Sequence, residues 1–379
     1  MTTPEPAAAV EPVESSELSA EETAEELAVD PDPGKIAYTT TDFDVDGLVR
    51  RLGRKDILIP TFGDEESGDE VDQLIETARF QRPFVWTRAQ MDRFIESLLL
   101  GYPIPGIFLV QQTDRSYLVL DGQQRLRTLA AFIDGMVNKK EFSLQYVADR
   151  FKGLTYKSMN PEQRRMLENT FIQATIVQPD GSVASLDAVY QVFERLNAGG
   201  TQLTPHEIRI ALYAGELVEW LTKLNASEEW RGLYGARPRH LRDQELILRV
   251  IALVVAPGTY KRPLKKFLND FMAAHRHLED LDCSDLEGRF KRAAQLVVDG
   301  PGVQSIRPSG TAVNAALTEA AIVGLMRALE AREVVPEEAV KGMAILLADT
   351  ELPGVIERAT ADEDSVRKRI ALATRAFAR

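Results

Sequence analysis

The sequence has few of the residues that form disulfides and metal clusters. Its 379 residues include one cysteine, Cys283, and four histidines. A single cysteine excludes an internal disulfide and a cysteine-based zinc cluster, as is usual for proteins of a reducing compartment. His275 and His277 stand two positions apart in a predicted helix, so they do not share a helix face. We therefore expect no metal site of the cysteine or histidine type.

Long apolar runs are also missing. The most apolar stretch, residues 246–256, is interrupted by Arg249 and falls short of the roughly 20 residues that a membrane-spanning helix needs. The first residues are acidic and have neither the positive start nor the apolar centre of a secretion signal. These absences predict a cytoplasmic protein with no membrane partner.

Basic residues are absent from the start of the chain. Residues 1–34 contain ten of the acids behind the net charge of −13, and no lysine or arginine. This segment is rich in Ala, Pro, Glu and Ser, so it has too little apolar surface to offset the entropy cost of ordering. We expect a disordered acidic tail over residues 1–35. Its role is either solubility or competition with nucleic acid for a basic groove.

The rest of the chain has the composition of an ordinary globular protein, with 44% apolar and 27% charged residues overall. Two short strands are predicted within residues 106–122 and another over 171–177. A helix is predicted after Thr87, a plausible N-cap with Gln90 three positions on, and another between residues 122 and 135. Residues 185–215 predict a helix, a Gly-Gly turn and a second helix, and from about residue 216 onward the pattern is mainly helical. We therefore predict an α+β fold, with a small mixed-sheet domain over 36–180 and a helical domain over 181–379.

The stretch "VLDGQQRLRTL" (119–129) carries the strongest local signal. A strand-like run ends in Asp121 and Gly122, and a helical pattern begins at once. A capping box formed by Asp121 and Gln124 accounts for part of this turn. It does not account for Arg125, because a cation in the first helical turn opposes the helix dipole. A bound anion would reverse that effect, so the turn is either a capped helix start or a phosphate cradle.

Two other stretches have the same ambiguity. "FQRPFVW" (80–86) places Gln81 and Arg82 before a predicted helix, where they are either an amphipathic lead-in or part of a polar pocket. "VFERLNAGG" (192–200) places Phe193 and Asn197 one helical turn apart, followed by two glycines. By itself this second pattern is typical of a helix C-terminus.

The three motifs together resemble the N-terminal domain of the GmrSD-type modification-dependent restriction proteins. "QR" at 81–82, "DGQQR" at 121–125 and "FERLN" at 193–197 occur in the order and at the spacing of that family. The resemblance covers residues 50–215 well and the helical remainder loosely. It implies a ParB/sulfiredoxin-like fold whose DGQQR turn contacts nucleotide phosphates. Members of the family hydrolyse nucleoside triphosphates, and some act in phage defence by sensing modified DNA.

The resemblance assigns roles to particular residues. It implies a nucleoside triphosphate and Mg²⁺ as cofactors, with Asp121, Gln124 and Arg125 as candidate catalytic residues. Asp121 is the candidate for positioning the metal or a water, and Arg125 the candidate for clamping a phosphate. The implied nucleotide-binding residues are Gln81, Arg82, Asp121, Gly122, Gln123, Gln124, Arg125 and Asn197.

Full-length members of the family carry a C-terminal His-Asn-His nuclease domain, whose constellation is missing from residues 216–379. We therefore expect no intrinsic nuclease activity and a separate nuclease or defence protein as a possible partner. DNA is the other expected partner, because nine basic residues and two acids lie between 231 and 266. The candidate DNA-binding residues are Arg237, Arg239, Arg242, Lys261, Arg262, Lys265 and Lys266. Ordinary surface salt bridges are the alternative interpretation of these cations.

Three functions thus stay open on sequence grounds. The chain is a nucleotide hydrolase coupled to DNA, a non-catalytic DNA-binding module, or a regulator that pairs with a nuclease through its helical domain. The identity of the nucleotide, any DNA modification, the partner and the oligomeric state are not readable from the sequence.

Overall fold

The chain forms two compact units that divide after Ala214. The computed structural model describes residues 36–60, 86–137, 139–196, 204–238, 240–308, 310–357 and 360–378. The predicted boundary at 180/181 differs from this division. The units divide later in the chain than predicted because of packing. The helix over residues 183–196 contacts the sheet, and the helix over residues 205–212 contacts that first helix. The predicted acidic tail lies outside the described residues.

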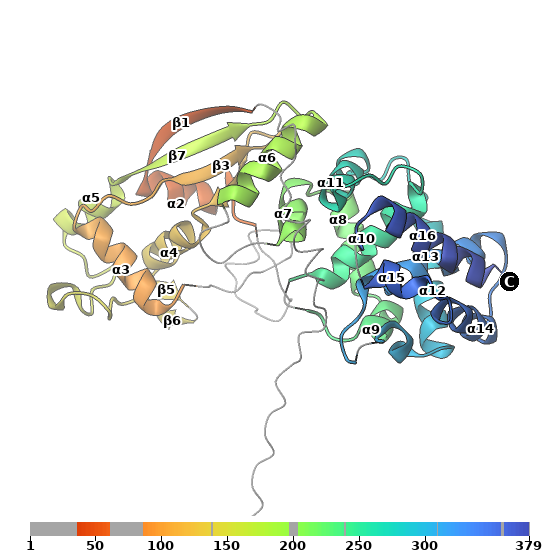
Figure 1. Ribbon diagram of the computed structural model, residues 1–379. Helices are drawn as coiled ribbons and strands as arrows, with labels where there is room; N and C mark the ends of the chain where they lie inside the picture. Colours follow the sequence, from red (N-terminus) through yellow and green to blue (C-terminus); the bar gives the residue numbers. More distant parts are fainter. Residues whose placement is uncertain are drawn as a thin grey trace, which may run out of the picture. The chain divides into compact units, whose positions relative to one another are not determined.

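The first unit is built on a five-stranded mixed sheet with the strand order β1-β7-β3-β4-β2 (Figure 1). Its strands are β1 (Ala37–Asp44), β2 (Ile57–Leu58), β3 (Ile107–Gln111), β4 (Tyr117–Asp121) and β7 (Phe171–Gln178). β1 pairs with β7 and β3 with β4 in antiparallel fashion, whereas the β3–β7 and β2–β4 pairs are parallel. Two short strands, β5 (Met136–Val137) and β6 (Lys140–Glu141), form a separate ribbon.

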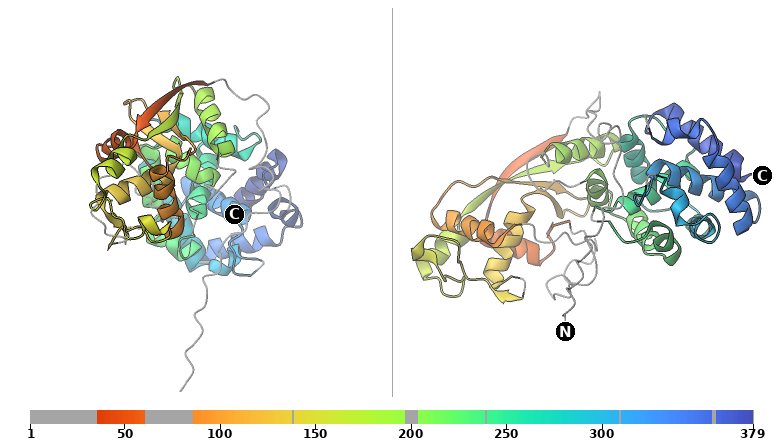
Figure 2. Two further views of the ribbon diagram at one scale, coloured as in Figure 1. Left: turned by 90° about the vertical axis from the view of Figure 1, so that its left-hand side faces the viewer. Right: turned by 60° about the horizontal axis from the view of Figure 1, so that its bottom comes forward.

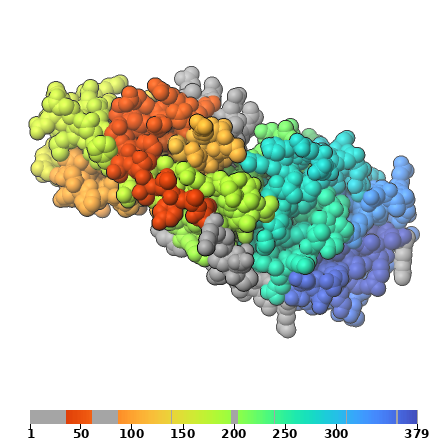
Figure 3. Space-filling model, turned by 90° about the horizontal axis from the view of Figure 1, so that it is seen from above, coloured from red at the N-terminus to blue at the C-terminus, as the bar shows by residue number. Residues whose placement is uncertain are grey.

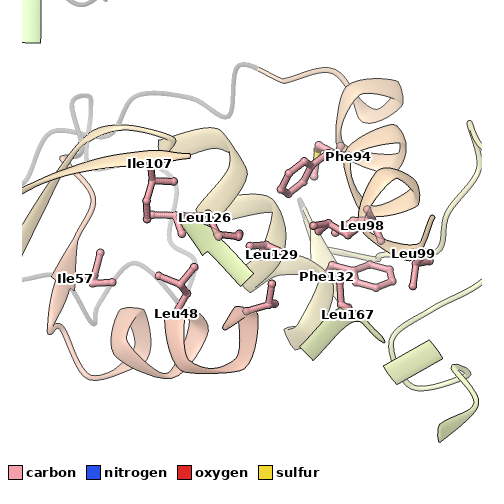
Figure 4. Close-up of a cluster of buried hydrophobic side chains, with 14 of the residues drawn as sticks. Leu48, Ile57, Phe94, Leu98, Leu99, Ile107, Leu126, Leu129, Phe132 and Leu167 are labelled. Atoms are coloured by element: carbon pink, nitrogen blue, oxygen red, sulfur yellow. The ribbon is translucent and has the colours of Figure 1, made fainter. Parts of the chain in front are cut away.

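Helices cover the sheet because their apolar side chains pack against its buried residues in one hydrophobic core. The helices of this unit are α2 (Val45–Gly53), α3 (Arg88–Leu99), α4 (Gln123–Asp134), α5 (Pro161–Glu168), α6 (Val183–Leu196) and α7 (Pro205–Leu212). Leu126, Leu129 and Phe132 of α4 are fully buried between α2 and α3, as Figure 4 shows. This packing fixes α4 and therefore also the turn that precedes it. A short 3₁₀ turn, η2 (Asp149–Phe151), lies in the connection to α5.

The polar face of α3 holds the chain that follows the β5–β6 ribbon. Asp92, fully buried, accepts hydrogen bonds from the backbone N–H groups of Gln145 (2.8 Å) and Tyr146 (3.0 Å). Its other oxygen pairs with Arg88 Nε at 2.7 Å. Glu96, one turn further, accepts from the N–H of Ala148 at 2.7 Å. Nη2 of Arg88 donates to the backbone oxygen of Ser143, so three positions at helical spacing anchor a segment that has no sheet or helix of its own.

The second unit is helical throughout the part that the structure describes (Figure 2). Its helices are α8 (Glu216–Asn225), α9 (Glu228–Tyr234), α10 (Arg242–Val255), α11 (Leu264–Ala274), α12 (Cys283–Asp299), α13 (Ala315–Ala331), α14 (Pro336–Leu347), α15 (Leu352–Ile356) and α16 (Glu363–Phe377), with the 3₁₀ turn η4 (Val303–Ile306). α13 is buried along most of its length and contacts α10, α12 and α16. None of the helices in the described ranges is both long enough and apolar enough to cross a membrane.

The predicted α+β class is confirmed. Strands β3, β4 and β7 and helices α3, α4 and α6 lie where the sequence pattern predicts them. The Thr87–Gln90 capping box at the start of α3 is present, and Gly135 ends α4 in a left-handed conformation. The sequence did not predict β1 or α5. The ParB-like character of the fold stays a prediction.

Candidate functional site

The turn at residues 121–125 joins the end of β4 to the start of α4. Asp121 is the last residue of β4 and pairs with Phe108 of β3. Gly122 is the N-cap of α4, with φ 96° and ψ 7°, and no side chain caps the helix. The capping box proposed for Asp121 and Gln124 is therefore wrong. Because Asp121 still belongs to the strand, its carboxylate reaches Arg125 instead of the helix N–H groups.

Gly122 allows two parts of the backbone to approach closely. A β-carbon on Gly122 would lie 2.4 Å from Cγ2 of Ile107, closer than real contacts allow. Its positive φ is a second reason for glycine, since other residues rarely adopt this conformation. The β3–β4 register shifts between Phe108 and Leu109, next to the turn. Such irregularities are common beside functional sites, because they redirect the residues that follow.

Arg125 ties the turn to the start of β3. Its Nη2 donates to Asp121 Oδ2 at 2.7 Å and to the backbone oxygen of Gly106 at 2.9 Å. The arginine side chain is 14% exposed and that of Asp121 is 47% exposed. Nε of Arg125 is buried and has no hydrogen-bond partner among the residues that the structure describes. The guanidinium is thus positioned by the sheet end and still has donor capacity.

Gln124 connects the turn to the lead-in of α3. Its Oε1 accepts a hydrogen bond from the backbone N–H of Trp86 at 3.3 Å. Trp86 stands four residues after Arg82 and packs edge-on against Phe94 at 5.4 Å. Gln81 and Arg82 themselves lie outside the described residues. The bond nevertheless brings the segment that follows the QR motif to the DGQQR turn.

The first N–H groups of α4 have no acceptor in the described part of the chain. The first backbone bond of this helix runs from Leu126 N to Gly122 O at 3.0 Å. Within the described ranges, the N–H groups of Gln123, Gln124 and Arg125 have no hydrogen-bond partner. A helix start with free N–H groups and a nearby guanidinium favours an anion. These groups fit a phosphate, and the half-exposed carboxylate of Asp121 has the oxygen chemistry that Mg²⁺ prefers.

The third motif lies at the end of α6. Phe193 is buried in this helix, and α6 contacts β4, the strand that leads into the turn. α6 ends at Leu196, so Asn197 lies just outside the described residues. The structure therefore places the helix that carries the motif, but it does not place the asparagine.

The candidate DNA-binding cations of the second unit have different environments. Arg237, Lys261 and Arg262 are exposed, Arg242 and Lys266 are partly exposed, and Lys265 is buried. Arg262 Nη1 pairs with Asp362 at 3.2 Å, and Lys266 Nζ pairs with Asp270 at 3.1 Å. Arg239 lies outside the described residues.

The aromatic residues among these cations are part of the core. Tyr260 and Phe267 are both buried, and their rings meet edge to face at 5.1 Å. They therefore support the surface from below. Stacking on nucleic-acid bases would need an exposed ring face.

No metal cluster is formed within the described ranges, since no three His, Cys, Asp or Glu side chains gather there. The helical pattern around "HRH" also ends earlier than predicted, because α11 stops at Ala274 and His275 is its C-cap.

Two site residues were not found from the sequence. Gly106 supplies the backbone oxygen that Arg125 holds, and Trp86 supplies the N–H that Gln124 holds. Both act through backbone atoms, so the type of side chain at these positions does not indicate the contact. The glycine after two prolines, in "PIPG", was the available hint for Gly106.

Comparison with curated proteins and with solved structures gave no match. A comparison with protein families did. The matched region contains all three motifs, at 81–82, 121–125 and 193–197. Residues 61–214 match the family model for the N-terminal domain of the GmrSD restriction endonuclease, and this part of the chain is therefore a GmrSD-type N-terminal domain.

Proposed function

We propose that the first unit binds a nucleoside triphosphate at the β4–α4 turn and hydrolyses it within a restriction-related defence system that recognises DNA. The family of residues 61–214 supports the restriction-related function. The observation that carries the nucleotide proposal is the uncapped start of α4, with Arg125 fixed beside it.

The side chains suggest a division of labour. The N–H groups at the start of α4 and the guanidinium of Arg125 would hold phosphate oxygens, since such charge-assisted bonds are the strong ones. Asp121 would hold Mg²⁺, which neutralises charge on the phosphates when it is bound. Gln124 keeps the Trp86 segment next to the turn. Gln81, Arg82 and Asn197 complete the proposed nucleotide-binding set.

The same chemistry suits a phosphate of DNA. In that case the unit is a non-catalytic DNA-binding module or a regulator of a separate nuclease. The distinction is between a free nucleotide that turns over and a phosphate that is only bound. A single experiment on the full chain separates them.

The experiment measures nucleotide binding and phosphate release for ATP, GTP, CTP and UTP with Mg²⁺, in the presence and absence of DNA. We expect Arg125→Ala to weaken binding roughly tenfold to a hundredfold, the loss typical of a charge-assisted hydrogen bond. Asp121→Asn should reduce Mg²⁺-dependent release more than it reduces binding. Arg115→Ala is the matched control, because Arg115 is exposed in the loop at the far end of the same β3–β4 hairpin.

Thermal unfolding of each variant tests whether Arg125 acts only through its bond to Gly106. Arg125→Lys keeps the charge but loses the planar fork, so it should unfold near the wild-type temperature and still bind weakly. Full binding and release by folded Arg125→Ala would overturn the proposal. Binding without release by the wild-type chain would favour the DNA-binding or regulatory function.

A further inference from the structure

The five-stranded sheet has two edges of very different length. β2 closes one edge with two residues, whereas β1, which Figure 1 labels, forms the other with eight. β1 pairs with β7 at every position from Ala37 to Asp44 without a bulge. It is therefore a long, regular edge strand, the kind that pairs readily with another strand.

β1 lacks most of the usual protections of an edge strand, and its two aspartates, Asp42 and Asp44, are its charged residues. Its sequence, AYTTTDFD, has no proline, glycine or lysine. Residues 37–42 are exposed, and the side chain of Tyr38 is 66% exposed. Figure 3 shows the red atoms of residues 36–60, to which β1 belongs, on the visible surface of this unit. No other strand in the described ranges lies on the outer side of β1.

The hydrogen-bond pattern shows which residues of β1 point their backbone groups outward. Just beyond the strand, Val45 N donates to Thr170 O at 3.1 Å, in line with the β1–β7 register. In an antiparallel pair, the residues that bond to the neighbour alternate with those that face away. The odd-numbered residues therefore face β7. Tyr38, Thr40 and Asp42 present their N–H and C=O groups to the open side, and Asp44, which is also the N-cap of α2, presents its N–H group there.

We propose that this edge is a dimer interface, at which β1 pairs antiparallel with β1 of a second copy. A two-fold axis through Thr41 uses all the outward-facing residues. It places Tyr38 opposite Asp44 and Thr40 opposite Asp42, so each acid faces a neutral residue. The two sheets then join into one continuous sheet through main-chain hydrogen bonds.

Charge and side-chain pairing favour this arrangement over its alternatives. A parallel, in-register pairing of two copies would bring Asp42 and Asp44 close to their own equivalents, and like charges in that position destabilise a sheet. An axis through Thr40 would leave Asp44 without a partner inside the strand. The axis through Thr41 also places Thr39 opposite Phe43, a β-branched and aromatic pair of the favourable kind.

The first test measures the mass of the full chain by sedimentation or light scattering over a range of concentrations. Wild type should form a dimer. Thr40→Pro removes one outward N–H group that β7 does not use, so it should shift the protein toward monomer at least tenfold. Thr40→Ala keeps that N–H group and should dimerise like wild type. Circular dichroism confirms that the proline variant is folded.

A second test does not depend on proline. Thr41→Cys, in a Cys283→Ala background, places a cysteine next to its equivalent at the axis, where opposite residues approach closely enough for a disulfide. Oxidation should cross-link this variant. Thr39→Cys on the same face is the matched control and should stay uncross-linked.

A monomeric wild type, or a Thr40→Pro dimer as strong as wild type, would overturn the proposal. Equal cross-linking of the two cysteine variants would also contradict it, because the register would then be wrong. A wild type that is monomeric alone but binds another protein through β1 would assign the edge to that partner. None of these outcomes depends on nucleotide binding.

Discussion

Gly122 is the residue on which the geometry of the turn depends most. Two independent constraints act on it, a left-handed backbone and the contact with Ile107. Gly135, at the other end of α4, shares the first constraint, with φ 88°, but has open space where a β-carbon would lie. Comparing the two glycines therefore separates the stability cost of a left-handed conformation, which both share, from the cost of the contact with Ile107, which only Gly122 has.

We expect Gly135→Ala to lower the free energy of unfolding by about 1–2 kcal/mol, the usual cost of a left-handed conformation. Gly122→Ala should cost clearly more, because Ile107 or the turn must shift to make room. Urea unfolding of both variants measures the difference. Equal losses would show that the Ile107 contact relaxes without cost.

At the same scale, the sequence predicts the residues of the site but not their partners. Asp121 to Arg125 stand out because a strand signal, a glycine and a first-turn cation coincide. The bond from Arg125 to Gly106 depends on which residues of β3 and β4 are paired, and that register includes a shift that no local pattern indicates. The predicted helix cap failed for a related reason, since the strand extends one residue further than the capping pattern assumed.

Among the elements, α3 shows how a single helix carries two functions. Its apolar face, including Phe94 and Leu98, packs into the core, and its opposite face anchors the segment 143–148. Asp92 is buried and satisfies three donors, whereas Glu96 accepts one bond at the surface. Asp92 should therefore contribute more to folding stability than any other residue of this face.

We expect Asp92→Ala to cost about 3 kcal/mol of folding free energy, because it leaves Arg88 and the N–H groups of Gln145 and Tyr146 without their buried acceptor. Glu96→Ala removes a single exposed bond and should cost about 1 kcal/mol. Chemical unfolding gives both values, and hydrogen exchange at Gln145 and Tyr146 reports the anchoring directly. If the two variants lost the same stability, burial of Asp92 would not be the cause.

The predicted elements are those whose sequence pattern is local. α3 and α4 have apolar residues at helical spacing and clear ends, so they were identified correctly. β1 was missed because six of its eight residues are exposed, so no apolar alternation marks it. It is a strand because β7 offers a partner along its whole length, and that pairing is a property of the tertiary fold.

For the whole molecule, the sequence predicted a sheet part followed by a helical part, but not where the compact units divide. α6 and α7 look like the start of the helical region in a linear pattern. Their packing places them in the unit with the sheet. A switch from strand-like to helix-like periodicity thus marks a change of element type, and only contacts decide to which unit a helix belongs.

Few of the candidate DNA-binding cations of the second unit lie together on its surface, so DNA binding by this unit would depend on a small number of them. Lys261 and Arg262 lie together on the surface before α11. Arg262 already pairs with Asp362, and its backbone N–H bonds to Glu363. A DNA phosphate must therefore compete with Asp362 and Glu363 for Arg262. Salt ions in turn compete with the DNA phosphate for the same cation.

We expect the affinity of the full chain for DNA to fall steeply with salt, so that the logarithm of the binding constant decreases linearly with the logarithm of the salt concentration. Replacing both Lys261 and Arg262 with Ala should weaken binding and make the slope shallower by about 0.9 for each phosphate contact that is lost. Lys341→Ala with Arg367→Ala removes the same charge from α14 and α16 and should leave the slope unchanged. Fluorescence anisotropy at several salt concentrations measures all three proteins. A slope near zero for wild type would exclude a phosphate-tracking surface, and equal slopes for both double variants would place the DNA contact elsewhere on the molecule.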